Sequence, residues 1–174
     1  MTRARCGFTF ALLLLVHCER DPDLPPAANG SESRCAVQRY VFGTTDGGEI
    51  SAEGMRRRVT VLVFVTTFDL ASQVAAKRVN QLLHAHRPRI NAAAVVLEAA
   101  KYAPLADVFR SSLELSYPVA IADLTTLEQS STLGEVRSVP VIVVLDREGR
   151  EVVRWAGAFS ASQLDGWLVG AERQ

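Results

Sequence analysis

Side chains suited to thiol or metal chemistry are few in this chain of 174 residues. The candidates are Cys6, Cys18, Cys35, His17, His84 and His86. No two cysteines have the Cys-x-x-Cys spacing of a dithiol redox centre, and no Cys/His cluster has the spacing of a zinc site. His84 and His86 are two residues apart, so they would lie on different faces of a helix as solvated side chains. The sequence therefore predicts no metal site and no bound cofactor.

The hydrophobic pattern predicts strands alternating with helices. Nearly apolar runs typical of buried strands lie at 59–65, 92–97 and 141–145. The other predicted elements are a hairpin over 37–51, helices at 70–85 and 105–112, a short strand at 119–122, and capping boxes opening helices at Thr125 and Ser160. The turn at 146–149 is too short for a parallel crossover, so the strands beside it must pair antiparallel. These elements predict an α/β fold with a central mixed β-sheet flanked by helices and an N-terminal β-hairpin extension.

Two loops of this arrangement resemble those of a known superfamily. The junction between the first core strand and its helix, Thr66–Ser72, resembles the active-site corner of the thioredoxin superfamily. The proline loop, Gly134–Pro140 (Gly-Glu-Val-Arg-Ser-Val-Pro), resembles the loop of that superfamily whose proline is cis. The hairpin and the stretch Leu145–Arg150 are similar to the TlpA-like and AhpC/TSA (redoxin) branch. The resemblance covers about residues 37–169 and implies a thioredoxin-like fold with a cis Val139–Pro140 bond.

The junction lacks the chemistry that the family pattern carries. Where the family has Trp-Cys-x-x-Cys, this chain has Phe68, Asp69, Leu70, Ala71 and Ser72. Thiol–disulfide exchange needs an attacking thiolate and a second thiol that resolves the mixed disulfide, and neither Asp69 nor Ser72 supplies one. The redoxin pattern loses its peroxidatic cysteine to Asp69 as well, and the buried carboxylate of thioredoxins corresponds to Val63. The resemblance therefore implies a degenerate active site with no catalytic residue assigned.

Asp69 is well placed to cap the helix that follows it. A carboxylate at a helix N-terminus accepts hydrogen bonds from free backbone N–H groups and meets the positive end of the helix dipole. We therefore expect Asp69 to be structural rather than catalytic. Ser72, one turn into the helix, is expected to be a small buried hydroxyl.

The proline loop carries the functional expectation. In the family this loop leaves a backbone edge free to pair with an extended peptide, which needs no cysteine. The resemblance implies that Ser138, Val139, Pro140 and Phe68 form a site for an extended peptide or an envelope protein. Two alternatives stay open. The first is an enzyme, either a thiol–disulfide oxidoreductase or peroxidase-related enzyme that uses Cys35, or one with an Asp69-based activity. The second is a purely structural envelope module.

The N-terminal residues resemble an export signal. Arg3 and Arg5 precede the apolar stretch 8–16, which is too short to span a bilayer. Leu15 lies three residues before Cys18, as in a bacterial lipoprotein signal, although His17 departs from the small residue usual there. We expect a signal peptide at 1–18, a lipid on Cys18, a flexible tether at 19–34 and one thioredoxin-like domain at 35–174. The expected location is the bacterial periplasm or cell envelope, anchored in the membrane, with Cys35 as a free thiol.

The charge balance excludes one class of partner. Lysine plus arginine and aspartate plus glutamate both total 19, so the sequence gives no electrostatic case for nucleic acid. The run Arg56–Arg58 is most simply a solvated loop before a strand. It would instead touch anionic lipid headgroups if the tether kept the domain near a membrane.

Overall fold

Five strands form one mixed sheet in the computed structural model, which describes residues 36–86, 88–128, 130 and 132–174. They are β3 (Val59–Val65), β4 (Ile90–Val96), β5 (Val119–Ile121), β6 (Val141–Leu145) and β7 (Glu151–Ala156), in the order β5-β4-β3-β6-β7. β3, β4 and β5 run parallel to one another, whereas β6 is antiparallel to both β3 and β7. The short turn between β6 and β7 thus joins an antiparallel pair, as the sequence predicted.

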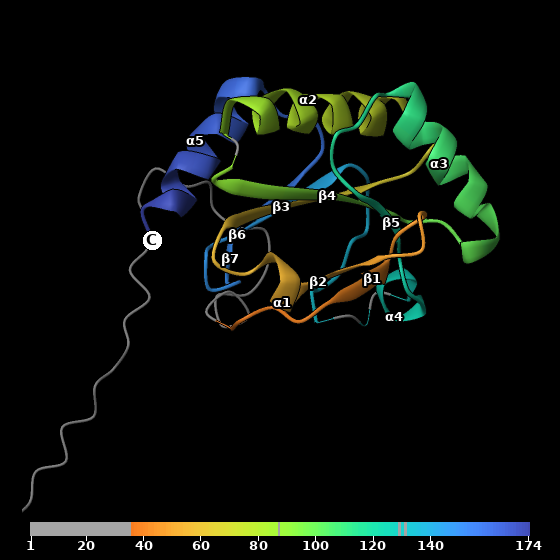
Figure 1. Ribbon diagram of the computed structural model, residues 1–174, viewed down its shortest axis with the longest axis horizontal. Coiled ribbons are helices and arrows are strands. Elements are labelled where there is room, and N and C mark those ends of the chain that lie inside the picture. Colours follow the sequence, from red (N-terminus) through yellow and green to blue (C-terminus); the bar gives the residue numbers. More distant parts are fainter. Residues whose placement is uncertain (1–35, 87, 129, 131) are drawn as a thin grey trace, which may run out of the picture.

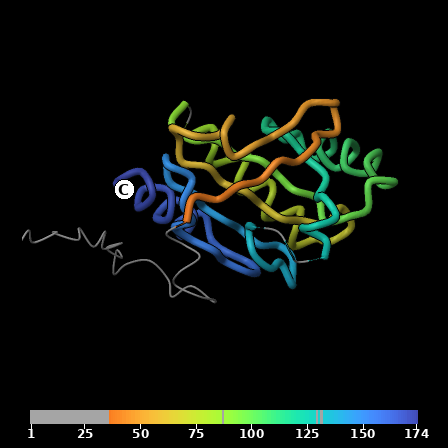
Figure 2. The backbone as a smooth tube through the Cα atoms, turned by 90° about the horizontal axis from the view of Figure 1, so that it is seen from below, coloured from red at the N-terminus to blue at the C-terminus, as the bar shows by residue number. Residues whose placement is uncertain are grey.

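Helices cover one face of the sheet and a hairpin covers the other (Figures 1 and 2). The helical layer contains α2 (Leu70–His86), α3 (Ala103–Ser112) and α5 (Ala161–Glu172), with the 3₁₀ turn η2 (Ala100–Tyr102) before α3. The hairpin consists of β1 (Val41–Gly43) and β2 (Glu49–Ser51), and the short helices α1 (Ala52–Met55) and α4 (Leu124–Leu127) lie on its side of the sheet (Figure 1). This architecture confirms the predicted fold class and the N-terminal hairpin extension.

The central strand β3 shows why its sequence is almost wholly apolar. Residues 59, 61, 63 and 65 pack into the core beneath the helices, while Leu62 and Phe64 pack against the hairpin. Because successive side chains of a strand point to opposite faces, a strand covered on both sides needs apolar residues at nearly every position. β3 thereby becomes the rigid element from which the junction Thr66–Ser72 emerges.

Two local predictions need correction. The buried face of α2 consists of Ser72, Ala75, Ala76, Val79, Leu83 and His86. The spacing of apolar residues in the sequence predicts a buried face of Ala71, Ala75, Val79 and Leu82. Ala71 is exposed and Leu82 is only half-buried, so the observed face is shifted by about one residue. The predicted capping box at Thr125 is wrong, because α4 begins at Leu124 and its cap lies two residues before Thr125. Its cap is Asp123, whose carboxylate accepts the Thr126 N–H at 2.9 Å.

Other expectations are confirmed or fall outside the described part of the chain. The Val139–Pro140 peptide bond is cis, and Ser160 and Gln163 form the predicted capping box of α5. No helix within the described residues is long and apolar enough to cross a membrane. The predicted signal peptide, the lipidation site Cys18, the tether at 19–34 and Cys35 lie outside those residues.

Candidate functional site

The junction and the proline loop meet at one end of the central sheet. Phe64 in β3 pairs with Val141 in β6. Continuing this antiparallel register by one residue places Pro140 opposite Val65, directly before the junction. The two segments that carry the resemblance are therefore brought together, although about 70 residues of sequence separate them. Their meeting point is the candidate site.

Ser72 has a structural role in the junction. Its side chain is fully buried, and its hydroxyl oxygen accepts the backbone N–H of Thr66 at 3.2 Å. This bond closes the chain reversal between β3 and α2, where the Thr66 N–H has no strand partner. The small buried hydroxyl that the sequence predicted is thus a structural element. It lacks the exposure that a nucleophile requires.

Asp69 caps α2 as predicted. Its carboxylate accepts the Ser72 N–H at 2.7 Å, and its carbonyl accepts the Gln73 N–H at 3.1 Å, which is the first bond of the helix. Hydrogen bonds from the Ser72 side chain, and then from the Ser72 backbone, hold the pKa of Asp69 below its ordinary value. Asp69 is therefore an anion at neutral pH. It meets the positive end of the helix dipole, as a thiolate would at the same place.

Glu98 belongs to the same site, and the sequence reasoning missed it. It follows β4, and its carboxylate accepts both the backbone N–H of Thr67 at 2.6 Å and the Thr67 hydroxyl at 2.8 Å. The signal was present in the sequence, because a polar residue directly after a buried parallel strand lies at the same sheet edge as the junction. Glu98 fixes the first half of the junction as Asp69 fixes the second half.

The proline loop differs from the junction in that its backbone is unused. Within the described residues, no backbone hydrogen bond is made by residues 135–139. Ser138 is exposed and Val139 is half-buried, while Pro140 is buried and its carbonyl accepts the Gly157 N–H at 2.8 Å. The loop is thus held at Pro140 and offers free N–H and C=O groups before it. Such groups are what an added strand requires.

Large apolar side chains stand exposed around the same end of the sheet. Phe68 is 81% exposed and Leu70 is 72% exposed, both directly after β3. Tyr102 and Leu124, which follow β4 and β5, are also exposed. Because the carboxyl ends of the parallel strands meet at this edge, these residues form an apolar rim at the end of the sheet where Pro140 also lies. Apolar side chains concentrated at one edge mark a surface suited to a partner.

The histidines and the remaining acidic side chains of the described residues do not form a metal site. Among the described residues, no group of three or more His, Cys, Asp or Glu side chains could hold a metal ion. His84 is exposed as expected, but the expectation of a solvated His86 is wrong. His86 is buried against α5, with Nε2 at 2.8 Å from the Asp165 carboxylate. His86 is buried because α5 packs against the end of α2, and the spacing of the two histidines in the sequence carries no information about that contact.

No protein-family model matches the sequence, and no curated protein matches it. Solved structures do match. A secreted disulfide oxidoreductase of Mycobacterium tuberculosis, homologous to E. coli DsbE, is 16% identical with a TM-score of 0.64, covering 81% of this chain and 99% of its own. A thiol:disulfide interchange protein of the thioredoxin family from Chlorobium tepidum is 18% identical with a TM-score of 0.63, covering 78% and 94%. StoA from Bacillus subtilis is 18% identical with a TM-score of 0.60, covering 76% and 97%.

These similarities establish that the chain has a thioredoxin-like fold. They span nearly the full length of the matched proteins, so the described domain corresponds to a whole domain of that type. The resemblance drawn from the proline loop and the hairpin is thereby confirmed at the level of the fold. What the junction does in this chain has to be argued from its own residues.

Proposed function

We propose that this protein is an exported, lipid-anchored thioredoxin-like protein that binds an extended peptide or protein segment at its proline loop and performs no dithiol chemistry. The observation that carries the proposal is the free backbone of residues 135–139 beside an exposed apolar rim. A peptide in an extended conformation would add its backbone to this edge, and Phe68 would cover its side chains.

The junction supports the part of the proposal that says the protein performs no dithiol chemistry. Asp69 and Ser72 occupy the two positions where the family pattern has cysteines, and both are engaged in backbone hydrogen bonds. Removal of the thiols therefore left a rigid junction and not an open one. Loss of the nucleophile does not affect binding at the proline loop, because the backbone groups that would bind a peptide lie in a different segment.

Export and anchoring rest on the sequence and on one matched protein. The apolar stretch at 8–16 and Cys18 have the order of a lipoprotein signal. The matched M. tuberculosis oxidoreductase is described as secreted. Mass spectrometry of the membrane fraction should therefore show a diacylated Cys18 as the new N-terminus, whereas an intact Met1 or an unmodified Cys18 would contradict the anchor.

Peptide binding can be tested with a random peptide library and the full chain. Peptides recovered from the library are titrated against wild type, Phe68→Ser and Val41→Ser by fluorescence anisotropy. Val41 is an exposed apolar residue in β1, on the hairpin, so it is the matched control. Because burying a phenylalanine contributes about 1.5–3 kcal/mol, Phe68→Ser should weaken binding about tenfold to a hundredfold, and Val41→Ser should not.

The same titration separates binding from thiol chemistry. Affinity should be unchanged by a reductant and by Cys35→Ser, because the proposed contacts include no sulfur. A library that yields no binding peptide, or peptides whose affinity ignores Phe68→Ser, would overturn the proposal. Binding that needs Cys35 would favour the single-thiol alternative.

A further inference from the structure

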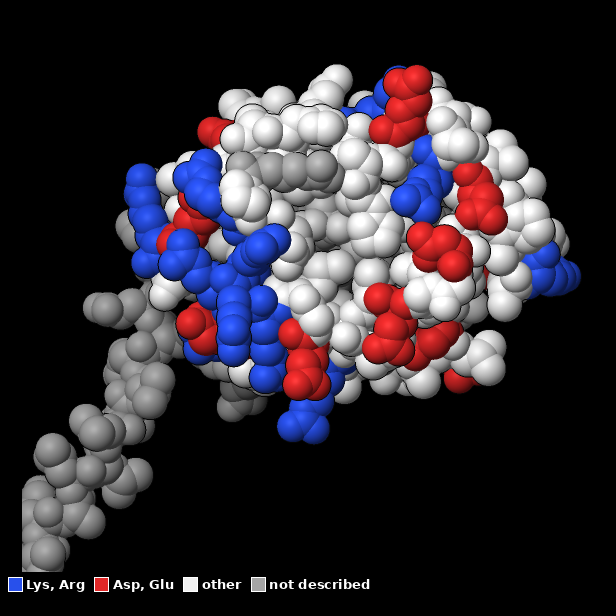
Figure 3. Space-filling model, in the orientation of Figure 1, with Lys and Arg blue, Asp and Glu red and all other residues white. Residues whose placement is uncertain are grey.

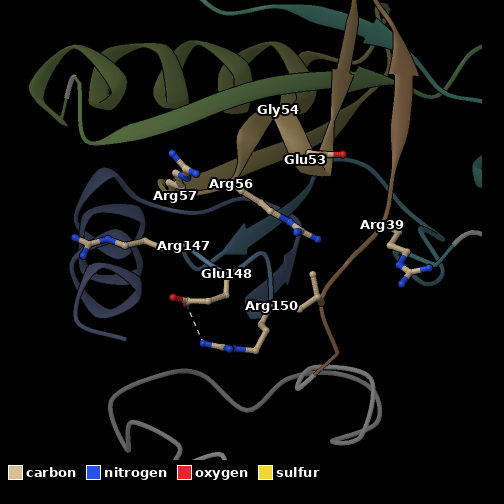
Figure 4. Close-up of a pocket in the computed structure, with 9 residues that line it drawn as sticks. Arg39, Glu53, Gly54, Arg56, Arg57, Arg147, Glu148 and Arg150 are labelled. Carbon is tan, nitrogen blue, oxygen red and sulfur yellow. Dashed lines mark hydrogen bonds and ion pairs between the residues drawn. The ribbon is translucent and has the colours of Figure 1, made fainter.

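At the opposite end of β3 from the junction, arginines gather around an open cleft of about 1320 Å³. The residues that line this arginine cleft are Val37, Arg39, Glu53, Gly54, Arg56, Arg57, Arg147, Glu148 and Arg150. They come from three separate stretches of the chain, as Figure 4 shows. In Figure 3 the lysine and arginine side chains likewise concentrate at the lower left of the molecule, while acidic side chains are more frequent on the right.

Backbone contacts hold the three stretches together. The N–H of Arg57 donates to the carbonyl of Arg147 at 2.9 Å, which joins the turn before β3 to the turn after β6. The N–H of Gln38 donates to the carbonyl of Gly149 at 2.8 Å, and Val37 and Arg150 form a β-bridge. The arginines are thus gathered by the fold, although the sequence shows only the run 56–58. The arrangement does not depend on the side chains themselves.

Five arginines and two glutamates, Glu53 and Glu148, line the cleft, so its lining carries a net positive charge. Arg150 is paired with the buried carboxylate of Asp146 and with Glu148, both at 2.9 Å. Within the described part of the chain, Arg39, Arg56, Arg57 and Arg147 make no ion pair, and all four are exposed. Guanidinium groups bind phosphate oxygens in a bidentate manner, so this cluster suits ligands with several phosphate groups close together.

The position of the N-terminal segment favours membrane lipids as the source of those phosphate groups. Val37, the second described residue, lines the cleft, so residues 1–35 join the domain at this face. If Cys18 is lipidated, as proposed above, about 18 residues connect the bilayer to the cleft. A flexible chain of that length has a root-mean-square span of roughly 25 Å. The cleft would then be held within reach of the lipid headgroups at high effective concentration.

We propose that the arginine cleft binds the phosphate groups of anionic membrane lipids and so lays this end of the domain on the bilayer. The proline loop lies beyond the other end of β3, a seven-residue strand roughly 20 Å long. Binding at the arginine cleft would therefore turn the candidate peptide site away from the membrane, toward partners in the surrounding compartment. This inference goes beyond peptide binding, and it can hold even if the proline loop binds nothing.

The test measures full-chain binding to vesicles of pure phosphatidylcholine and to vesicles that contain phosphatidylglycerol. The apolar stretch 8–16 would insert into both kinds, so the readout is the ratio of the two affinities. A basic residue near an anionic surface contributes about fivefold in affinity, so the triple variant Arg56→Gln, Arg57→Gln, Arg147→Gln should lower the ratio roughly a hundredfold at low salt. In about 1 M salt, where the Debye length is near 3 Å, the wild-type preference should disappear.

Two further variants isolate the cleft. The control Lys77→Gln, Lys101→Gln, Arg173→Gln removes three exposed basic residues elsewhere and should lower the ratio far less. The variant Arg56→Lys, Arg57→Lys, Arg147→Lys keeps the charge but loses the bidentate contacts, so its ratio should lie between those of the wild type and the glutamine variant. The proposal is overturned if the arginine-to-glutamine variant and the control have the same ratio.

The same measurements distinguish lipid from two other ligands of the cleft. Binding of pyrophosphate to the full chain, together with equal affinity for the two kinds of vesicle, would assign the cleft to soluble phosphates. A wild-type chain without lipid preference that gains one when Glu19, Asp21, Asp23 and Glu32 are changed to glutamine would assign the cleft to the acidic tether. Either result would overturn binding to lipid.

Discussion

The two ends of β3 use their polar side chains in opposite ways. At the junction, Ser72, Asp69 and Glu98 all accept hydrogen bonds from nearby backbone N–H groups. At the arginine cleft, the backbone segments are joined to each other, and most of the charged side chains point into solvent without ion-pair partners in the described chain. At the junction end, the polar side chains are used in hydrogen bonds within the fold, so the free groups that could bind a partner are backbone groups of the proline loop. At the arginine cleft, the backbone groups are used within the fold, so the free groups are the arginine side chains.

This contrast supports the proposal that the junction performs no dithiol chemistry. A catalytic residue needs an unsatisfied reactive group at an accessible place, together with a partner that activates it. At the junction, the Ser72 hydroxyl is fully buried and accepts the Thr66 N–H, and the Asp69 carboxylate accepts the Ser72 N–H as a helix cap. The free groups of that end lie in the neighbouring proline loop, and they are hydrogen-bonding groups without chemical reactivity.

The largest expected change in stability lies beneath the arginine cleft. Asp146 is 1% exposed, and its Oδ1 accepts the backbone N–H groups of Glu148 and Arg150, each at 2.9 Å. Asp146→Ala should lower the free energy of unfolding by about 3 kcal/mol, because two N–H groups and Arg150 lose their buried partner. Asp146→Asn keeps the acceptor oxygen and should cost less. Equal losses in urea unfolding would show that the turn does not depend on these bonds.

A smaller loss is expected at the junction. Ser72→Ala removes the acceptor of the Thr66 N–H and should cost about 1–2 kcal/mol in chemical denaturation. The matched control is Ser162→Ala, an exposed serine in the first turn of α5, which should change stability by less than about 0.5 kcal/mol. A neutral Ser72→Ala would mean that the chain reversal is held by packing alone.

The smallest effect is expected at the helix cap. Asp69→Ala should lower Tm by a few degrees, and Asp69→Ser should lower it less because serine also caps helices well. The pKa of Asp69 is depressed in the folded state by its bonds to Ser72. Its contribution is therefore fully present above the ordinary value of about 3.9 and is lost as the pH falls through the lower folded pKa. The Tm difference between wild type and Asp69→Ala should accordingly shrink below about pH 4, and a constant difference would contradict the capping role.

Much of the fold could be predicted because its signals are local. The strands β3, β4 and β6 are continuous apolar runs, and the proline loop has a recognisable sequence before a core strand. The face of α2 was misplaced by one residue because alanines such as Ala71 and Ala75 are equally compatible with a buried or an exposed position. Thr125 was chosen as a cap over Asp123 because both residue types favour that position.

The candidate site was only partly predictable, because its contacts join segments that are distant in sequence. The capping role of Asp69 and the burial of Ser72 followed from their spacing at the start of one helix, whereas the bond between Ser72 and Thr66 was not predicted. The contact between Thr67 and Glu98 depends on the pairing of β3 with β4. The arginine cleft combines residues near 39, 56 and 148, and no single window of the sequence contains it.

The central claim is that the junction keeps the geometry of a dithiol site without its chemistry. The most direct measurement is insulin reduction by the wild-type chain beside the variant Asp69→Cys, Ser72→Cys. We expect the wild type to show no activity above background. The variant should fold, form a disulfide between the new cysteines, and show weak activity limited by the absence of a buried carboxylate at Val63. Robust wild-type activity that disappears in Cys35→Ser, or a folded variant whose new cysteines cannot be oxidised to a disulfide, would contradict the account.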